Sequence, residues 1–207
     1  MLGAAKIPML GKSVPALDAT GTVYTQTSGP SFNTQIPGGA NVGDLLLLFV
    51  ASHGFNPSTP SGWTLVANEP GNVHLSVYKR VCQAGDAGTN VTQTISSAAL
   101  ISCIFAYRNA STVDTSAVNN SGGTAPTTWA APTVTTTVSS CLILSFWGAQ
   151  NTTAVTNPNL SRLNANDGIS DTCAISEMLQ RPAGVSATQT ASSALSRPWS
   201  ALTIAFR

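Results

Sequence analysis

The side chains that could perform acid–base chemistry are few in this chain. Its only histidines are His53 and His74, and its carboxylates are Glu69, Glu177 and six aspartates. Nucleophilic hydrolysis needs a serine or cysteine, a histidine base and an orienting carboxylate, yet no GxSxG elbow is present. Glycoside cleavage needs two carboxylates at a defined separation, and the carboxylates here are scattered over turn-rich segments. We therefore expect no catalytic residues and no enzymatic activity.

Oxygen ligands gather once, in the segment NANDGISD at residues 164–171. Asn164, Asn166, Asp167 and Asp171 surround a glycine, and such spacing can hold calcium. The segment lacks the bidentate glutamate and the full ligand series of an EF-hand loop, so an Asx-rich turn before a strand explains it better. We expect no metal and no cofactor.

Four cysteines complete the reactive side chains: Cys82, Cys103, Cys141 and Cys173. No CxxC pair occurs, which makes a zinc site improbable on spacing alone. Cys103 and Cys141 lie inside apolar runs, where reduced buried thiols are common. The sequence leaves open whether disulfides form after release into an oxidising medium.

One tryptophan stands apart from the apolar runs. Trp129 lies in a segment rich in Thr, Ser, Asn and Gly, whereas Trp63, Trp147 and Trp199 begin or end apolar runs and are predicted core residues. An exposed aromatic face beside amides is typical of a sugar site. Trp129 could equally pack beneath its own loop, and the sequence does not decide between these placements.

Composition excludes several classes of function and favours β-structure. The 207 residues include 24 Ser and 26 Thr, only 8% are charged, and the net charge is +1. That charge gives no electrostatic basis for binding nucleic acid. No apolar stretch is long enough for a membrane span, so we expect no membrane insertion. The N-terminus is broken by Lys6 and Pro8 and does not resemble a secretory signal.

Short runs rich in Val, Ile, Thr, Leu and aromatic residues alternate with Gly, Pro, Asn and Ser clusters, a pattern that predicts strands. We expect eleven: residues 22–27, 44–51, 63–67, 73–82, 91–95, 99–107, 133–138, 141–147, 172–179, 186–190 and 199–206. The runs DLLLLFVAS, ALISCIFAYRN, CLILSFWGA and WSALTIAFR are apolar on both faces, so we expect them at the centre of sheets with a cover on the second face. Long loops are expected at 52–62, 111–132 and 148–170, and no repeat with a period of 20–50 residues is visible. The predicted fold is all-β: a two-sheet antiparallel β-sandwich, jelly-roll-like.

The first twenty residues form a separate predicted unit. Apolar side chains are spaced irregularly among prolines and glycines, which rules out a continuous helix. Leu2, Ile7, Met9 and Leu10 would carry docking if this segment is an extended arm that buries them against a neighbour. We therefore expect an arm at residues 1–20 and a β-sandwich domain at 21–207.

The order of motifs resembles a known family. The chain runs IPGGANVGDLLLLFVAS, PSGWTLV, VYKRV with AGDAG, IFAYRN followed by Asp114, APTVTTTVSSCLILSFW and WSALTIAFR. This is similar to β-sandwich modules of structural proteins in tailed bacteriophages and prophages, and the likeness covers roughly residues 21–207.

The resemblance implies a virion protein without catalytic activity, assembled in the bacterial cytoplasm and later extracellular. It would be a capsid-decorating (cement) or tail-associated subunit that contacts copies of itself and other virion proteins. Few lysines and glutamates are available to protect sheet edges from pairing, which suits a subunit whose edges neighbours cover. The alternative is a tail-fibre adhesin that binds a host-surface glycan, with Trp129 as the candidate contact.

Overall fold

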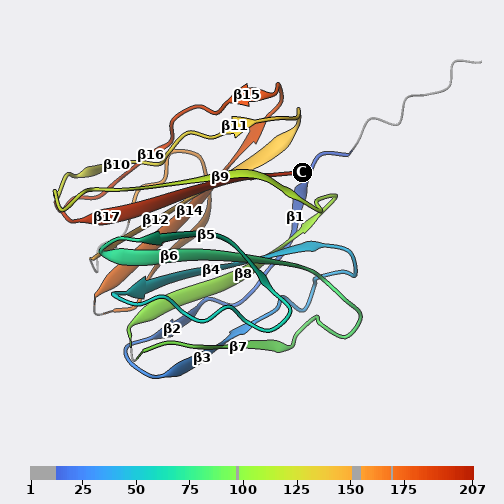
Figure 1. The fold of residues 1–207 in the computed structure, drawn as a ribbon, viewed down its shortest axis with the longest axis horizontal. Helices are drawn as coiled ribbons and strands as arrows, with labels where there is room; N and C mark the ends of the chain where they lie inside the picture. Colours follow the sequence, from blue (N-terminus) through green and yellow to red (C-terminus); the bar gives the residue numbers. More distant parts are fainter. Residues whose placement is uncertain (1–12, 97, 151–154, 169) are drawn as a thin grey trace, which may run out of the picture.

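The protein is built from strands alone in the part of the chain that the structure describes. This computed structural model describes residues 13–96, 98–150, 155–168 and 170–207 (Figure 1). No helix in these ranges is long and apolar enough to cross a membrane. The all-β, two-sheet antiparallel sandwich predicted from the sequence is confirmed.

Each main sheet comes from one half of the chain. Sheet one has the order β1-β8-β4-β6-β5, with β2 also pairing β8; its strands are β1 (Ala16–Thr20), β2 (Tyr24–Gln26), β4 (Leu45–His53), β5 (Thr64–Pro70), β6 (Val73–Val81) and β8 (Leu100–Arg108). Sheet two has the order β13-β14-β12-β17-β9; its strands are β9 (Val113–Asn120), β12 (Cys141–Gln150), β13 (Leu160–Asn166), β14 (Asp171–Gln180) and β17 (Trp199–Phe206). The chain thus completes one sheet before it enters the other, crossing after β8.

Three short strand pairs lie outside these sheets. They are β3 (Ser31–Gln35) with β7 (Asn90–Thr94), β10 (Thr128–Ala130) with β16 (Thr190–Ser192), and β11 (Thr135–Thr136) with β15 (Gly184–Val185). Figure 1 shows β3 and β7 below sheet one, and the other two pairs above sheet two. The two main sheets are therefore inner layers.

The main core fills the space between the two sheets. Alternate residues of the central strands point into it, as the period of two along a strand requires. Phe49 of β4 contacts Phe105 of β8 and Phe146 of β12 edge to face, with ring centroids 5.7 and 5.3 Å apart. These three rings join both sheets at the centre of the molecule.

The outward faces of the central strands are covered, as their apolar sequence predicts. Leu46, Leu48 and Val50 of β4 pack beneath Phe32 of β3 and Val91 of β7. On sheet two, Trp147 and Ala149 of β12 pack beneath β10 and β16 in a second cluster. Strands with both faces buried have no polar side to alternate, which explains their continuous apolar runs.

Six strands were not expected from the sequence: β1, β3, β9, β10, β13 and β15. The expected loops at 111–132 and 148–170 are wrong in part, because β9, β10 and β13 lie within them, and the strand expected at 186–190 meets β16 only at Thr190. β9 and β13 are edge strands with the polar sequences VDTSAVNN and LSRLNAN, which lack the apolar signal of a central strand. Residues 16–20 form β1, so the sandwich begins before the boundary expected after residue 20.

The two halves repeat the same strand order. Read from one edge, sheet one is β1-β8-β4-β6-β5 and sheet two is β9-β17-β12-β14-β13. In both sheets, the five strands numbered in chain order lie in the spatial order first, fifth, second, fourth, third. The inward-facing phenylalanines of β4 and β12, Phe49 and Phe146, pair with the equivalent inward-facing residues Val77 and Ile175 on the neighbouring strands. The repeat spans about half the chain, well beyond periods of 20–50 residues.

Irregularities of the ladders also recur. The pairing of β5 with β6 shifts register around Val66, and that of β13 with β14 shifts around Arg162. At the opposite edges, shifts occur around Asp18 in β1 and Asp114 in β9. The sequence TQTISSA at residues 92–98 returns as TQTASSA at 188–194. Matched bulges and a matched heptapeptide identify the halves as two copies of one structural unit.

Candidate functional site

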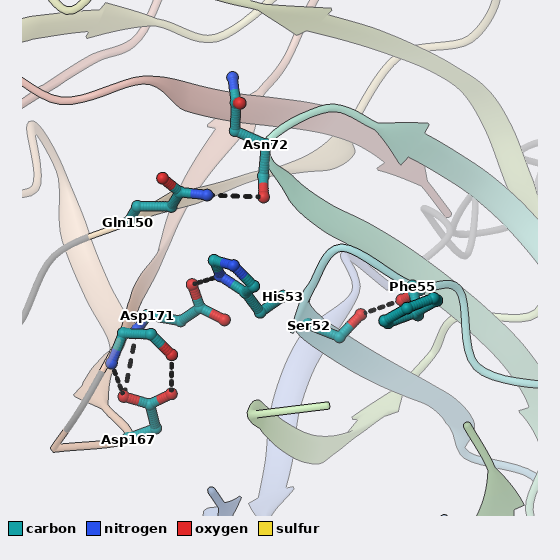
Figure 2. Close-up of polar contacts among 8 residues, drawn as sticks. Ser52, His53, Phe55, Asn72, Gln150, Asp167 and Asp171 are labelled. Carbon is teal, nitrogen blue, oxygen red and sulfur yellow. Dashed lines mark hydrogen bonds and ion pairs between the residues drawn. The ribbon is translucent and has the colours of Figure 1, made fainter. Parts of the chain in front are cut away.

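Polar side chains meet where the two halves join at one end of the sandwich. His53 is the last residue of β4, and Gln150 is the last residue of β12, its equivalent in the second half. His53 Nδ1 lies 3.3 Å from Asp171 Oδ1 at the start of β14, and Gln150 Nε2 donates to the carbonyl of Asn72 at 3.4 Å (Figure 2). These contacts connect sheet one to sheet two across the junction of the repeats.

Asp171 is the electrostatically unusual member of this group. Its side chain is fully buried, and Oδ2 has no hydrogen-bond partner among the described residues. Burial raises the pKa of Asp171 to about 6; contact with His53 opposes this shift, and the neighbouring charge of Asp167 adds to it. The His53 side chain is 46% exposed, so solvent reaches the imidazole but not the carboxylate.

The arrangement around His53 does not assemble a hydrolytic triad. The neighbouring Ser52 is buried, and its Oγ donates to the carbonyl of Phe55 at 2.5 Å. Figure 2 shows this hydroxyl directed toward Phe55. A nucleophilic serine would have to hydrogen-bond to the imidazole that accepts its proton. The contact of His53 with Asp171 instead connects the two sheets through polar groups.

The two glutamates lie in separate interactions. Glu69 Oε1 accepts a hydrogen bond from Asn120 Nδ2 at 2.8 Å, which joins β5 to β9. Glu177 accepts from Arg162 Nε at 3.0 Å, from Arg162 Nη2 at 2.6 Å and from the Tyr107 hydroxyl at 3.1 Å. Glu69 therefore links strands β5 and β9, and Glu177 links β14 to β13 and β8.

The network around Glu177 was not expected from the sequence. Arg162 comes from the edge strand β13, whereas Tyr107 comes from β8 in the opposite sheet. Burial raises the pKa of Tyr107 well above its usual value, and the nearby Glu177 carboxylate adds to the shift. Residues 107, 162 and 177 show no local motif, so only the packing of one sheet on the other could reveal the network.

In the segment at 164–171, Asn166 ends β13 and Asp171 begins β14, and the Asx-rich turn that the sequence favoured is centred on Asp167 between them. Asp167 Oδ1 accepts hydrogen bonds from the backbone N–H groups of Ser170 and Asp171, at 2.8 and 3.1 Å. Asn166 Oδ1 accepts from the N–H of Gly168 at 3.1 Å. Within the described residues, no group of three or more His, Cys, Asp or Glu side chains is placed to hold a metal ion.

The Trp129 side chain packs beneath its loop, so the expectation that it could offer an exposed face to a glycan is wrong. The side chain is fully buried with Trp147 and Trp199, and its Nε1 donates to the carbonyl of Pro126 at 3.0 Å. The carbonyl of Trp129 in turn accepts from Trp147 Nε1 at 3.0 Å. The polar sequence around Trp129 concealed its burial, because β10 and β16 come together only in the folded chain.

The remaining expected residues divide into two groups. Leu2, Ile7, Met9 and Leu10 lie outside the described residues, so their role in docking stays a prediction. Cys82, Cys103, Cys141 and Cys173 are all free and buried in the structure, in agreement with reduced core thiols. Burial raises the pKa of Cys103 to about 12, which keeps it a neutral thiol.

Comparisons with known proteins found no relative: no family model, no curated protein and no solved structure matches this chain.

Proposed function

We propose that this protein is a non-enzymatic structural subunit on the exterior of a tailed-bacteriophage particle. It would decorate the capsid as a cement protein or associate with the tail, in contact with copies of itself and with other virion proteins. The resemblance of its strand and turn motifs to phage β-sandwich modules motivates the assignment to a virion. The edges of the two sheets supply the physical support.

The edge strands carry few charges that would oppose pairing with another chain, and a bulge in each of β1, β5, β9 and β13 interrupts the ladder. In the described structure, β1 and β2 border sheet one on one side and β5 on the other, and β9 and β13 border sheet two. None of these strands contains a lysine, and β2 has no charged residue. Each of the other four has a single charged residue with a partner inside the chain: Asp18 with Arg108, Glu69 with Asn120, Asp114 with Thr137, and Arg162 with Glu177. Soluble monomers commonly place unpaired charges at such edges.

Three of these strands also expose a large apolar side chain. Leu65 of β5 is 46% exposed, Val118 of β9 is 44% exposed, and Leu160 of β13 is 56% exposed. This combination at sheet edges is the observation that carries the proposal. Covering such residues with a neighbouring subunit removes apolar surface from water at about 25 cal/mol per Å².

The location of the protein in purified particles tests the proposal most directly. We expect labelled antibody or tag density at many copies on the capsid shell or at defined positions along the tail. Absence of the protein from purified particles would overturn the assignment.

Two sets of variants separate the arm from the edges. Deleting residues 1–12 spares β1 and should lower incorporation into particles if the arm docks. Replacing both Leu65 and Leu160 by Lys should lower incorporation through the edges, while Val185→Lys, at an exposed site on the short strand β15, should not. Normal occupancy of all three variants would exclude docking by either route.

A further inference from the structure

A hollow lies between the loop that follows β4 and the end of β7. It has a volume of about 410 Å³ and is lined by Asn56, Pro57, Ser58, Thr94, Ile95 and Ser96. Sites for small ligands occupy roughly 300–1,000 Å³. The hollow is therefore large enough to hold one or two sugar rings or a molecule of similar size.

The loop that forms one wall is fixed by hydrogen bonds. Ser58 N–H donates to the carbonyl of Thr94 at 2.8 Å, and Thr94 N–H donates to Ser58 Oγ at 3.0 Å. The carbonyl of Ser58 accepts from the buried Gln93 Nε2 at 2.7 Å. A wall tied on both sides of Ser58 loses little conformational entropy when a ligand binds.

The neighbouring residues of the loop are also held. The carbonyl of Pro57 accepts from the buried Tyr78 hydroxyl at 3.0 Å, and Asn56 Oδ1 lies 2.9 Å from His74 Nδ1. Phe55 has its carbonyl fixed by Ser52 while its side chain is 48% exposed (Figure 2). These contacts hold the backbone of the loop at Phe55 and Pro57 and the side-chain amide of Asn56 in set positions.

The lining is neutral, and this selects the chemistry of a ligand. Asn56 offers an amide and Ser96 a hydroxyl. The Thr94 hydroxyl donates to Ser58 Oγ at 3.0 Å and so offers an acceptor, while Ser58 Oγ, which accepts from both the N–H and the hydroxyl of Thr94, offers a donor. Among the residues that the structure describes, no lysine, arginine, aspartate or glutamate lines the hollow, so a phosphate or carboxylate would find no charged partner there. A saccharide without charge supplies matching hydroxyls, together with C–H faces that pack on aliphatic side chains such as Ile95.

We propose that this hollow is a binding site for a neutral saccharide. The inference goes beyond the assembly role, because the hollow involves none of the edge strands or N-terminal residues on which that role depends. It also differs from the Trp129 site expected from the sequence, which is buried. The shared chemistry is a hydroxyl-rich ring, found in free sugars and in cell-surface polysaccharides.

The second half of the chain gives a natural comparison. Thr190, in the repeated TQT sequence, corresponds to Thr94, and Ser192 corresponds to Ser96. In the second half, backbone hydrogen bonds from another segment occupy the position of Ser192. Thr156 and Ser192 exchange two hydrogen bonds, of 2.8 and 3.1 Å, across this position. The equivalent position Ser192 is thus already engaged, so the control is placed at Ser196, an exposed serine beyond the repeated heptapeptide.

The test uses the full chain, labelled with ¹⁵N and titrated with D-glucose, D-galactose, N-acetyl-D-glucosamine and dextran in separate arms. We expect saturable shifts of the amide signals of Asn56, Ser58 and Thr94 with at least one sugar. Tighter binding of dextran than of glucose would identify a polymer as the source, and equal affinity per ring would identify a free sugar. Absence of saturable shifts at these residues in every arm would overturn the proposal.

Two variants assign the binding to the hollow. Ser96→Trp fills the space and should weaken binding at least about tenfold, whereas Ser196→Trp, at an exposed serine of the second half, should leave it unchanged. If Ser96→Trp does not fold, Thr94→Val replaces it and should weaken binding by about tenfold, the scale of one lost hydrogen bond. Unchanged affinity in the folded variant would place the saccharide elsewhere and refute the site.

Discussion

The two halves of the chain form sheets with the same strand order, but they differ in what covers the outer face of each sheet. In the first half, β3 and β7 cover sheet one over a single apolar cluster that includes Phe32, Ile36 and Trp63. In the second half, the outer face of sheet two is covered by two smaller clusters, one around Trp129 and one around Cys141. The inner faces, by contrast, meet in one continuous core. Complementarity between the sheets constrains both halves at once, whereas each cover must fit only its own sheet.

The halves also differ in the polar groups that hold their edges. Arg162 and Glu177 form a bidentate pair in the second half, and the equivalent bulge and neighbouring strand of the first half carry Val66 and Lys79. The edge strand β13 of the second half is thus tied to the opposite sheet through an ion pair that reaches Tyr107, whereas the edge strand β5 of the first half is tied to the sheet opposite it through the hydrogen bond of Glu69 with Asn120. We expect the consequences of substitution to be symmetric in the core and asymmetric at the edges.

The largest expected effects are in the shared core. Phe49→Ala and Phe146→Ala should each lower the free energy of unfolding by about 3–5 kcal/mol, the typical cost of emptying a buried phenylalanine site. Urea denaturation of both variants measures this. Because the residues occupy equivalent positions, a strongly unequal pair of values would contradict the equivalence of the halves.

A smaller effect is expected at the asymmetric edge. Arg162→Met should lower the free energy of unfolding by about 2–3 kcal/mol, because it removes charge-assisted hydrogen bonds from the largely buried Glu177. The control is Arg108→Met, whose ion pair with Asp18 in the first half is 59% exposed on the arginine side and should cost less than about 1 kcal/mol. Equal losses in the two variants would show that the network around Glu177 adds nothing.

A further effect on stability is expected at one inward-facing position where the two halves carry side chains of different size. Gly148 of β12 corresponds to Ala51 of β4, and a Cβ on Gly148 would lie 2.7 Å from Leu75 Cδ2 and 2.9 Å from Val73 Cγ1. Gly148→Ala should therefore destabilise by about 1–3 kcal/mol through overpacking. Ala51→Gly should cost about 0.5–1 kcal/mol through added backbone freedom. Thermal unfolding compares the two, and a stabilising Gly148→Ala would show that the sheets can move apart.

The last expected effect is a pH dependence of stability that arises at the junction of the halves. Since burial raises the pKa of Asp171 to about 6 from an ordinary value of 3.8, the folded protein binds this proton more readily than the unfolded chain does. Asp171 should therefore contribute stability that increases as the pH falls from about 6 to about 4.

Urea denaturation at several pH values measures this contribution. Asp171→Asn should remove part of the increase in stability. Asp44→Asn is measured beside it, because burial also raises the pKa of Asp44 and its contribution to the same pH range must be separated from that of Asp171. An unchanged pH profile in Asp171→Asn would show that the carboxylate is not held in a desolvated site.

The comparison of halves also shows how far the sequence alone reaches. Central strands could be predicted because their apolar runs persist wherever they pack, and β4, β8, β12 and β17 lie close to their expected limits. The edge strands β9 and β13 could not, since half-exposed edges accept the same Thr, Ser and Asn residues as loops. The half-chain repeat was hidden for a related reason: alternation of apolar residues is conserved between the halves more than their identity.

At the candidate sites, residue types could be read from the sequence but their partners could not. The absence of a CxxC pair and of apolar spans could be seen directly in the chain. The burial of Trp129 could not, because its own strand β10 and the partner strand β16 are separated by about sixty residues. The hollow at Asn56 and Thr94 likewise depends on two segments that are distant in sequence.

Alternation, turn residues and a shortage of charge were enough to specify an all-β chain with covered central strands, because these are properties of neighbours along the backbone. Tertiary structure alone decided which half faces which, where Glu177 finds its arginine and tyrosine, and which side chains remain in contact with water. Those outcomes depend on contacts between residues far apart in the chain, and the local sequence pattern does not record them.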